Sequence, residues 1–124
     1  MDYEKLYSDF KGIFPQYADR MDMLAKDANA DENDGIHIMF SFVVVPFVIT
    51  LLNEDSDVQI KKAFDFFERM ASSDDVSVTE VLEFSVIENL MSSENIIFEK
   101  SKEYMGQEML KCLKTVSAYM SVGE

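Results

Sequence analysis

Side chains with acid, base or nucleophilic chemistry are few in this 124-residue sequence, and they stand apart from one another. The single histidine is His37 and the single cysteine is Cys112, and neither lies in a recognisable catalytic motif. Glu80 and Glu83 could serve as an acid and a base, but on a helix such a pair is far more often a solvated face. We therefore expect that the chain is not an enzyme.

Patterns that bind metals or cofactors are also missing from the sequence. One cysteine excludes a multi-thiolate zinc site, and the glycines stand alone rather than in a phosphate-binding loop. The spacing Asp27-x-Asn29-x-Asp31 is that of a calcium loop, but the sixth and twelfth positions of that loop are Glu32 and Ile38 instead of glycine and glutamate. We expect no cofactor and no metal.

The strongest chemical feature of the sequence is its negative charge. The formal net charge is −13, from 24 acidic and 11 basic residues. No Lys or Arg lies between Lys26 and Lys61 or between Arg69 and Lys100, and each of these windows holds seven acids. Such a field opposes nucleic acid and anionic lipid and attracts basic proteins. The alternative is that the charge only keeps a small protein soluble and monomeric.

An uncharged stretch at residues 36–52 is the element around which the rest must pack. Its seventeen residues fall just below the roughly 20 that a membrane-spanning helix needs. Its internal polar residues and its acidic flanks, which offer no Lys or Arg as an anchor, favour a buried core element over a membrane span. A strand would lack a convincing partner in the rest of the chain. We therefore predict a central helix.

Two details of this central helix can be predicted. Pro46 removes a backbone donor inside the helix and predicts a bend within about one turn. His37 and Ser41, at positions i and i+4, would share its one polar edge. We expect His37 to be a rim residue rather than a catalyst.

Apolar residues recur at helical intervals in the remaining chain. They predict helices over residues 3–14, 15–28, about 57–72, 77–91 and 94–102, and a last helix that Gly106 precedes or interrupts. Ser56 with Gln59, and Ser77 with Glu80, match the capping-box pattern that begins a helix. We predict an all-α fold, in which residues 1–124 form a single-domain array of about six to seven helices with HEAT-like antiparallel pairs.

This topology predicts where the acids lie. If successive helices run antiparallel, the loops at 28–35 and 73–77 lie at one end of the array, and the loops at 53–57 and 92–94 lie at the other. Six acids would then converge on one pole as the predicted partner-binding site: Asp27, Asp31, Glu32, Asp34, Asp74 and Asp75.

Three segments carry a resemblance to a known kind of protein. They are Phe66-Phe-Glu-Arg-Met-Ala-Ser-Ser-Asp-Asp, Val81-Leu-Glu-Phe-Ser-Val-Ile-Glu-Asn-Leu90 and Ser101-Lys-Glu-Tyr-Met-Gly-Gln-Glu-Met-Leu110. The chain resembles a family of small acidic helical bacterial proteins, which look like the immunity proteins of contact-dependent or polymorphic toxin systems. The resemblance implies a cytoplasmic antitoxin that binds one cognate secreted toxin domain and masks its active site.

The charge supports this hypothesis, because a nuclease toxin is commonly basic where it holds phosphate, and an acidic pole could occupy that surface. The N-terminus has mixed charge and no apolar h-region, so we expect no secretory signal and a cytoplasmic protein. We expect a protein partner, no nucleic acid and no membrane. Two alternatives stay open: a helical adaptor or regulatory domain that binds a cellular protein, and an enzyme that uses His37.

Overall fold

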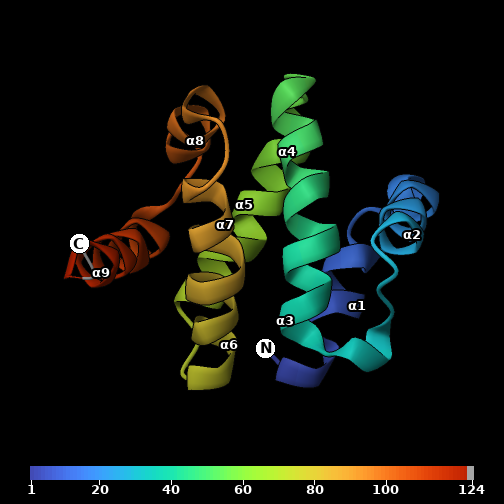
Figure 1. Ribbon diagram of the computed structural model, residues 1–124, viewed down its shortest axis with the longest axis horizontal. Helices are drawn as coiled ribbons and strands as arrows, with labels where there is room; N and C mark the ends of the chain where they lie inside the picture. The colour runs from blue at the N-terminus through green and yellow to red at the C-terminus, as the bar shows by residue number, and fades with distance from the viewer. Residues whose placement is uncertain (123–124) are drawn as a thin grey trace.

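The computed structural model describes residues 1–122 of the chain and shows an array of helices (Figure 1). These residues form seven helices and no strand, which confirms the predicted all-α class. The α-helical bounds are α1 Leu6–Gly12, α2 Ala18–Asp27, α3 Ile36–Met39, α4 Val45–Asn53, α5 Asp57–Ala71, α6 Val76–Glu80, α7 Glu88–Met91, α8 Asn95–Lys102 and α9 Gln107–Val122. Short 3-10 segments lie at Tyr3–Lys5, Pro15–Tyr17 and Glu32–Asp34.

Two of the seven helices contain a π-helical segment in the middle. The segment Phe40–Val44 joins α3 to α4, and the segment Val81–Ile87 joins α6 to α7. Each pair is therefore one continuous helix, called here the α3–α4 helix and the α6–α7 helix.

The α3–α4 helix, Ile36–Asn53, is the central element that the uncharged stretch predicted. By length and composition alone it could also cross a membrane, but half of it is buried inside the folded chain. Its fully buried side chains include Phe40, Phe47, Leu51 and Leu52. Burial of that much apolar surface is the main favourable term in folding, so this helix organises the core.

Pro46 is accommodated by a change of helix type rather than by a break. The N–H of Val45 donates to the carbonyl of Phe40, five residues back, at the end of the π-helical segment. The wider turn makes room for the proline ring, which would otherwise clash with the carbonyl four residues before it. Pro46 then lies in the first turn of α4, where a missing N–H matters least.

Aromatic rings fill the core between α1, the α3–α4 helix and α5. The ring of Phe10 lies at the centre, and its centroid is between 5.2 and 6.3 Å from those of five other rings: Phe14, Phe40, Phe47, Phe66 and Phe67. Two of these pairs, with Phe47 and Phe66, meet edge to face, an arrangement that the ring quadrupole favours. The amphipathic stripe of the N-terminal segment therefore supplies the aromatic centre of the fold.

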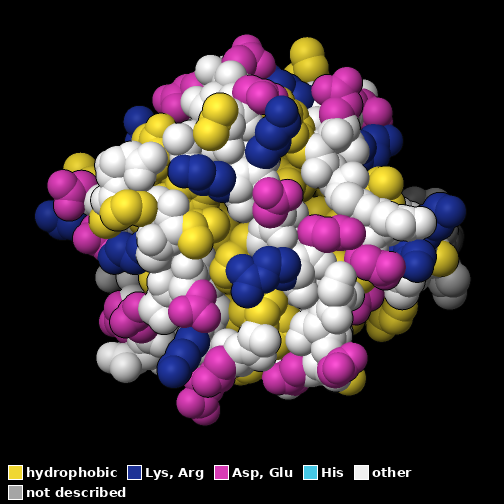
Figure 2. Space-filling model, turned by 180° about the vertical axis from the view of Figure 1, so that it is seen from behind, with side chains coloured by type: hydrophobic (Ala, Val, Ile, Leu, Met, Phe, Trp, Pro, Cys, Tyr) yellow, Lys and Arg dark blue, Asp and Glu magenta, His cyan; other side chains and the backbone are white. Residues whose placement is uncertain are grey.

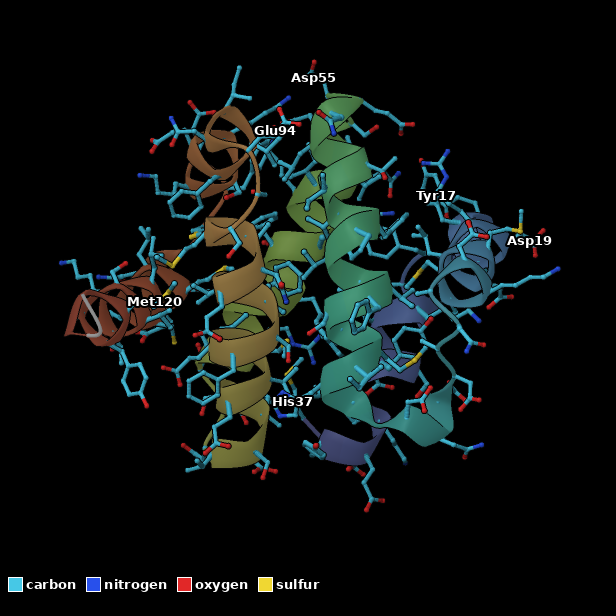
Figure 3. All side chains as sticks on the ribbon, in the orientation of Figure 1. Tyr17, Asp19, His37, Asp55, Glu94 and Met120 are labelled. Atoms are coloured by element: carbon cyan, nitrogen blue, oxygen red, sulfur yellow. The ribbon has the colours of Figure 1, made fainter. Side chains whose placement is uncertain are left out.

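The α3–α4 helix and the α6–α7 helix lie side by side and run in the same direction, and α5 returns behind them in the opposite direction (Figure 1). α1 and α2 flank this layer on one side, and α8 and α9 on the other. The loops before α3 and before α6 thus lie at the lower end of the view. The loops after α4 and α7 lie at the upper end, where Asp55 and Glu94 are labelled in Figure 3. This is the predicted arrangement of loops.

α5 begins at Asp57 as predicted, but neither predicted capping box is formed. Asp75, not Ser77, caps the α6–α7 helix, because its carboxylate accepts a hydrogen bond from the N–H of Ser77 at 2.9 Å. Ser56 precedes α5, but its side chain makes no capping hydrogen bond. The carboxamide oxygen of Gln59, its predicted capping-box partner, is buried without a hydrogen bond in the described residues. Both predicted capping boxes were therefore wrong.

Candidate protein-binding surface

Five of the six predicted acids lie at the lower end of the array. Asp31, Glu32 and Asp34 belong to the turn before α3, Asp74 and Asp75 precede α6, and all five are exposed. We call these five residues the acidic pole. The sixth, Asp27, is exposed at the C-terminal end of α2.

The N-terminal residues connect the two halves of the acidic pole. Met1 lines an open depression together with Asp74 and Asp75. Glu4, in the 3-10 segment that follows Met1, lines a neighbouring recess together with Glu32. Asp27 lines neither of these hollows. The structure thus brings the two acidic loops to either side of the N-terminal segment.

Two of the acids have a structural task within their own turn. Asp31 accepts a hydrogen bond from the N–H of Asn33 at 2.8 Å, and Asp34 accepts one from the N–H of Asp31 at 2.8 Å. The reciprocal pair fixes the 3-10 turn that leads into the central helix. Gly35 follows with φ +104°, a conformation that favours glycine. Glu32 has no part in this hydrogen-bond pair, so its charge is free to act outward.

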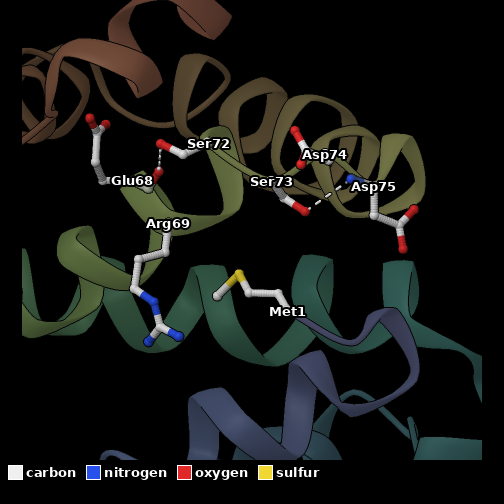
Figure 4. Close-up of a pocket in the computed structure, with 7 residues that line it drawn as sticks. All are labelled: Met1, Glu68, Arg69, Ser72, Ser73, Asp74 and Asp75. Carbon is white, nitrogen blue, oxygen red and sulfur yellow. Dashed lines mark hydrogen bonds between the residues drawn. The ribbon is translucent and has the colours of Figure 1, made fainter.

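The other loop divides its two acids in the same way. Asp75 caps the α6–α7 helix through Ser77, and its own N–H donates to the hydroxyl of Ser73 at 3.1 Å. In Figure 4 the side chain of Met1 lies between Arg69 and Asp75, and the carboxylate of Asp75 points away from the guanidinium. Asp74 caps nothing.

The pairing of acids differs sharply between the two ends of the molecule. At the upper end Glu54 pairs with Arg20 at 3.3 Å, Asp55 pairs with Lys100, and Asp57 pairs with Lys61 at 3.1 Å. At the lower end none of the five acids of the acidic pole forms an ion pair within residues 1–122. Three of the upper acids are thus neutralised by the chain itself, although Glu94 at the same end forms no ion pair within the described residues, whereas all five acids of the acidic pole lack an ion-pair partner there.

A lysine close to the acidic pole is engaged elsewhere. Lys11 lines a recess with Asp31 and Glu32, but its ammonium pairs with Asp22 at 2.5 Å. Tyr7 lines the same recess, and its pKa is raised to about 12 by burial and then by the charges of Asp22 and Glu32. Burial is the largest cause of this shift, and Glu32 is the one member of the acidic pole among the charges that add to it.

Asp2 and Glu4 also lie beside this surface, although the sequence did not predict them there. Both are exposed acids of the N-terminal segment, and Asp2 caps it by accepting a hydrogen bond from the N–H of Glu4 at 3.1 Å. Their position beside the acidic loops depends on how the segment packs against distant helices. The only signal in the sequence was two acids at the start of an amphipathic helix.

The residues considered for catalysis have other partners. His37 Nδ1 lies 2.7 Å from the hydroxyl oxygen of Ser85. Cys112 is half-buried, and burial followed by the charges of Glu83, Glu108 and Glu68 raises the pKa of its thiol. A raised pKa disfavours the nucleophilic thiolate. Within residues 1–122 no three His, Cys, Asp or Glu side chains are grouped so that they could hold a metal ion.

Comparison with protein families matches a model described as "Domain of unknown function (DUF7674)" to residues 7–120. No curated protein and no solved structure matches the chain.

Proposed function

The chain belongs to the DUF7674 family of unknown function, and from its surface we propose that it is a non-catalytic acidic protein that binds a basic protein partner. The resemblance to immunity proteins makes the proposal specific: the partner is a cognate secreted toxin domain, such as a basic nuclease. The chain would act as its antitoxin by covering the toxin's active site.

One observation carries this proposal, namely the set of unpaired acids in the acidic pole. Like charges gathered without counter-charges destabilise a folded protein through mutual repulsion. The same chain pairs three of its upper acids with Arg20, Lys61 and Lys100, so pairing is available to this fold. A basic partner would supply the missing counter-charges and would be attracted from a distance, which raises the association rate.

The proposal requires no chemistry from the chain. A nuclease must hold phosphate with basic side chains, so an acidic surface of matching shape competes for the same groups. Occupation of that surface would block substrate without any covalent step. A rigid helical array suits this task, because binding then loses little conformational entropy.

The test is a pull-down with the product of the gene immediately upstream, followed by a growth-rescue assay with that product expressed in bacteria. Glu32→Lys with Asp74→Lys reverses charge at the two acids of the pole that cap nothing. We expect this double variant to rescue growth poorly and the wild-type chain to rescue it fully. Asp19→Lys on α2 is the control, since Asp19 is exposed and lies outside the acidic pole.

The alternatives give different results in the same assays. A helical adaptor would capture a cellular protein and would not rescue growth from a neighbouring toxin. An enzyme that depends on His37 would lose rescue on His37→Ala, whereas the binding proposal expects that variant to behave like the wild type in the growth assay.

A further inference from the structure

The face seen in Figure 1 carries a line of polar contacts between its two parallel helices. His37 Nδ1 lies 2.7 Å from Ser85 Oγ, and Asn89 Nδ2 donates to Ser41 Oγ at 3.3 Å. Figure 3 labels His37 between the α3–α4 and α6–α7 helices. We call these four residues the front seam. The view from the opposite side shows no histidine at the surface (Figure 2).

The two π-helical segments meet at this seam. Phe40–Val44 and Val81–Ile87 contact one another across the helix pair. Pro46 explains the first segment, but no proline lies in the α6–α7 helix. π-helical turns are rare and are often found at functional sites, where the extra residue redirects side chains. Here the second segment contains Ser85, one of the two seam residues on that helix.

Large apolar side chains flank the front seam and are open to solvent. Phe42 is 51% exposed and Phe84 is 44% exposed. Phe42 follows the seam residue Ser41 in sequence, whereas Phe84 precedes the seam residue Ser85. The two helices are parallel and face each other. One residue after a seam residue on the first helix and one residue before a seam residue on the second therefore point toward the same face of the helix pair. Ile38, 37% exposed, continues the row one turn before Phe42.

The charge around this apolar row is entirely negative along the two helices. The α3–α4 helix has no Asp, Glu, Lys or Arg, and the α6–α7 helix carries Glu80, Glu83 and Glu88 without any Lys or Arg. The acidic pole lies at the N-terminal ends of both helices. In contrast, the opposite face carries Lys and Arg side chains mixed with Asp and Glu (Figure 2).

We propose that the front seam is the docking site for a basic amphipathic helix of the protein partner. Its apolar side chains pack on Ile38, Phe42 and Phe84, and its Lys and Arg side chains meet Glu80, Glu88 and the acidic pole. The shallow line between two parallel helices can accept a third helix, which is a common mode of recognition. This inference rests on the proposed function and names the surface and the partner element that it uses.

A second copy of the chain fits the same surface poorly. Each copy carries a net charge of −13, and the helices beside the front seam contribute only acids. Two such faces would repel one another, since like charges placed opposite in an interface are unfavourable. A basic helix removes that repulsion and covers the exposed rings at the same time. The negative charge of this surface therefore favours a basic helix over a second copy of the chain.

The test uses the full chain and two fluorescein-labelled peptides of equal length, one an amphipathic helix of Leu and Lys and the other of Leu and Glu. Fluorescence anisotropy measures binding at physiological salt. We expect the Lys peptide to bind and the Glu peptide not to bind. Phe42→Ala with Phe84→Ala should weaken binding about tenfold or more, because exposed aromatic anchors commonly dominate an interface.

The matched control is Val58→Ala with Ile96→Ala, which removes apolar side chains that are 64% and 72% exposed on α5 and α8. We expect the control to change affinity by less than about twofold, as surface positions outside an interface do. Circular dichroism of both double variants shows whether each is folded as the wild type is.

Three results would overturn the inference. The first is unchanged affinity of the folded Phe42→Ala, Phe84→Ala variant for the Lys peptide. The second is equal binding, or no binding, of both peptides. The third is a wild-type dimer in sedimentation analysis that the same two substitutions abolish. If Phe42→Ala with Phe84→Ala still rescues growth while Glu32→Lys with Asp74→Lys does not, the seam inference fails and the proposed function stands. If both double variants rescue growth, the proposed role of the acidic pole in binding fails as well.

Discussion

At the scale of single residues, Glu68 joins two distant helices. Its carboxylate lies on α5 and accepts hydrogen bonds from the N–H groups of Glu108 at 2.9 Å and Met109 at 2.8 Å, in the first turn of α9. Those N–H groups would otherwise lack a partner, and a negative charge at a helix N-terminus is favourable. A Cβ on Gly106 would lie 2.5 Å from the carboxyl carbon of Glu68. Glycine at 106 therefore leaves room for this cap.

Gly106→Ala should lower the free energy of unfolding by about 1–2 kcal/mol, because the new methyl group must displace the carboxylate from both N–H groups. Gly12→Ala is the control, since a Cβ there meets nothing within 4 Å. Urea denaturation measures both. In a chain that already carries Glu68→Ala, Gly106→Ala should lower the free energy of unfolding little further. If Gly106→Ala costs as much in that chain as in the wild type, displacement of Glu68 is not the cause of its effect.

Asp57 provides a residue-scale prediction for pH dependence. A hydrogen bond from the hydroxyl of Tyr104, at 2.7 Å, and then one from Lys61 hold the pKa of Asp57 below its ordinary value of 3.8. A carboxyl group whose pKa is lower in the folded state contributes stability above pH 3.8, and that stability is lost as the pH falls through the folded pKa. Tyr104→Phe should therefore raise the pKa of Asp57, as measured by NMR titration of its carboxyl carbon. An unchanged titration would contradict the assigned cause.

At the scale of the elements, most helices could be predicted because their apolar residues recur with the helical period. Pro15 separates the first two helices, because a proline ring disfavours helical dihedral angles in the residue before it. Phe14 accordingly has φ −125° and ψ 56°. The π-helical segments could not be predicted. Where a stretch is apolar on nearly all sides, an extra residue in one turn does not visibly shift an apolar stripe in the sequence. The cap from Glu68 was equally hidden, since it joins residues 40 positions apart.

The front seam is the element-scale feature that holds the two long helices in register. Ser85 is 3% exposed, and its hydroxyl is the partner of His37. Ser85→Ala should destabilise the fold by about 1 kcal/mol, because a half-buried imidazole nitrogen loses its partner. Ser92→Ala is the matched control, because its exposed hydroxyl bonds only the carbonyl of Glu88 in the same helix. Equal effects of the two substitutions in thermal or urea unfolding would refute a special role for the seam.

At the scale of the whole molecule, the sequence revealed two windows without basic residues but could not show which acids would be paired. Pairing depends on which helices end beside one another, and the fold brings Arg20, Lys61 and Lys100 to the upper end. It also places the N-terminal acids Asp2 and Glu4 near the acidic pole. The sequence could therefore predict that acids gather at one end of the array, but not that all five acids of the acidic pole lack an ion-pair partner within residues 1–122.

If Glu32 and Asp74, the two acids of the acidic pole that cap nothing, serve binding rather than folding, removal of their charges should not weaken the fold. Glu32→Gln with Asp74→Asn should leave the free energy of unfolding unchanged or raise it by up to about 0.5 kcal/mol at low salt, because repulsion is relieved. Asp75→Ala should instead cost about 1 kcal/mol, since it removes a helix cap. A loss of stability in the first variant as large as in the second would assign Glu32 and Asp74 a structural role.

The most direct test of the central claim is the association rate of the chain with its proposed partner, the product of the gene immediately upstream, measured by stopped flow over a range of salt concentrations. The account predicts a fast rate that falls steeply as salt increases. Glu32→Lys with Asp74→Lys should slow association about tenfold at low salt and flatten its salt dependence, while Asp19→Lys should change little. Identical rates and salt dependence for the wild type and the double variant would contradict a role of the acidic pole in binding.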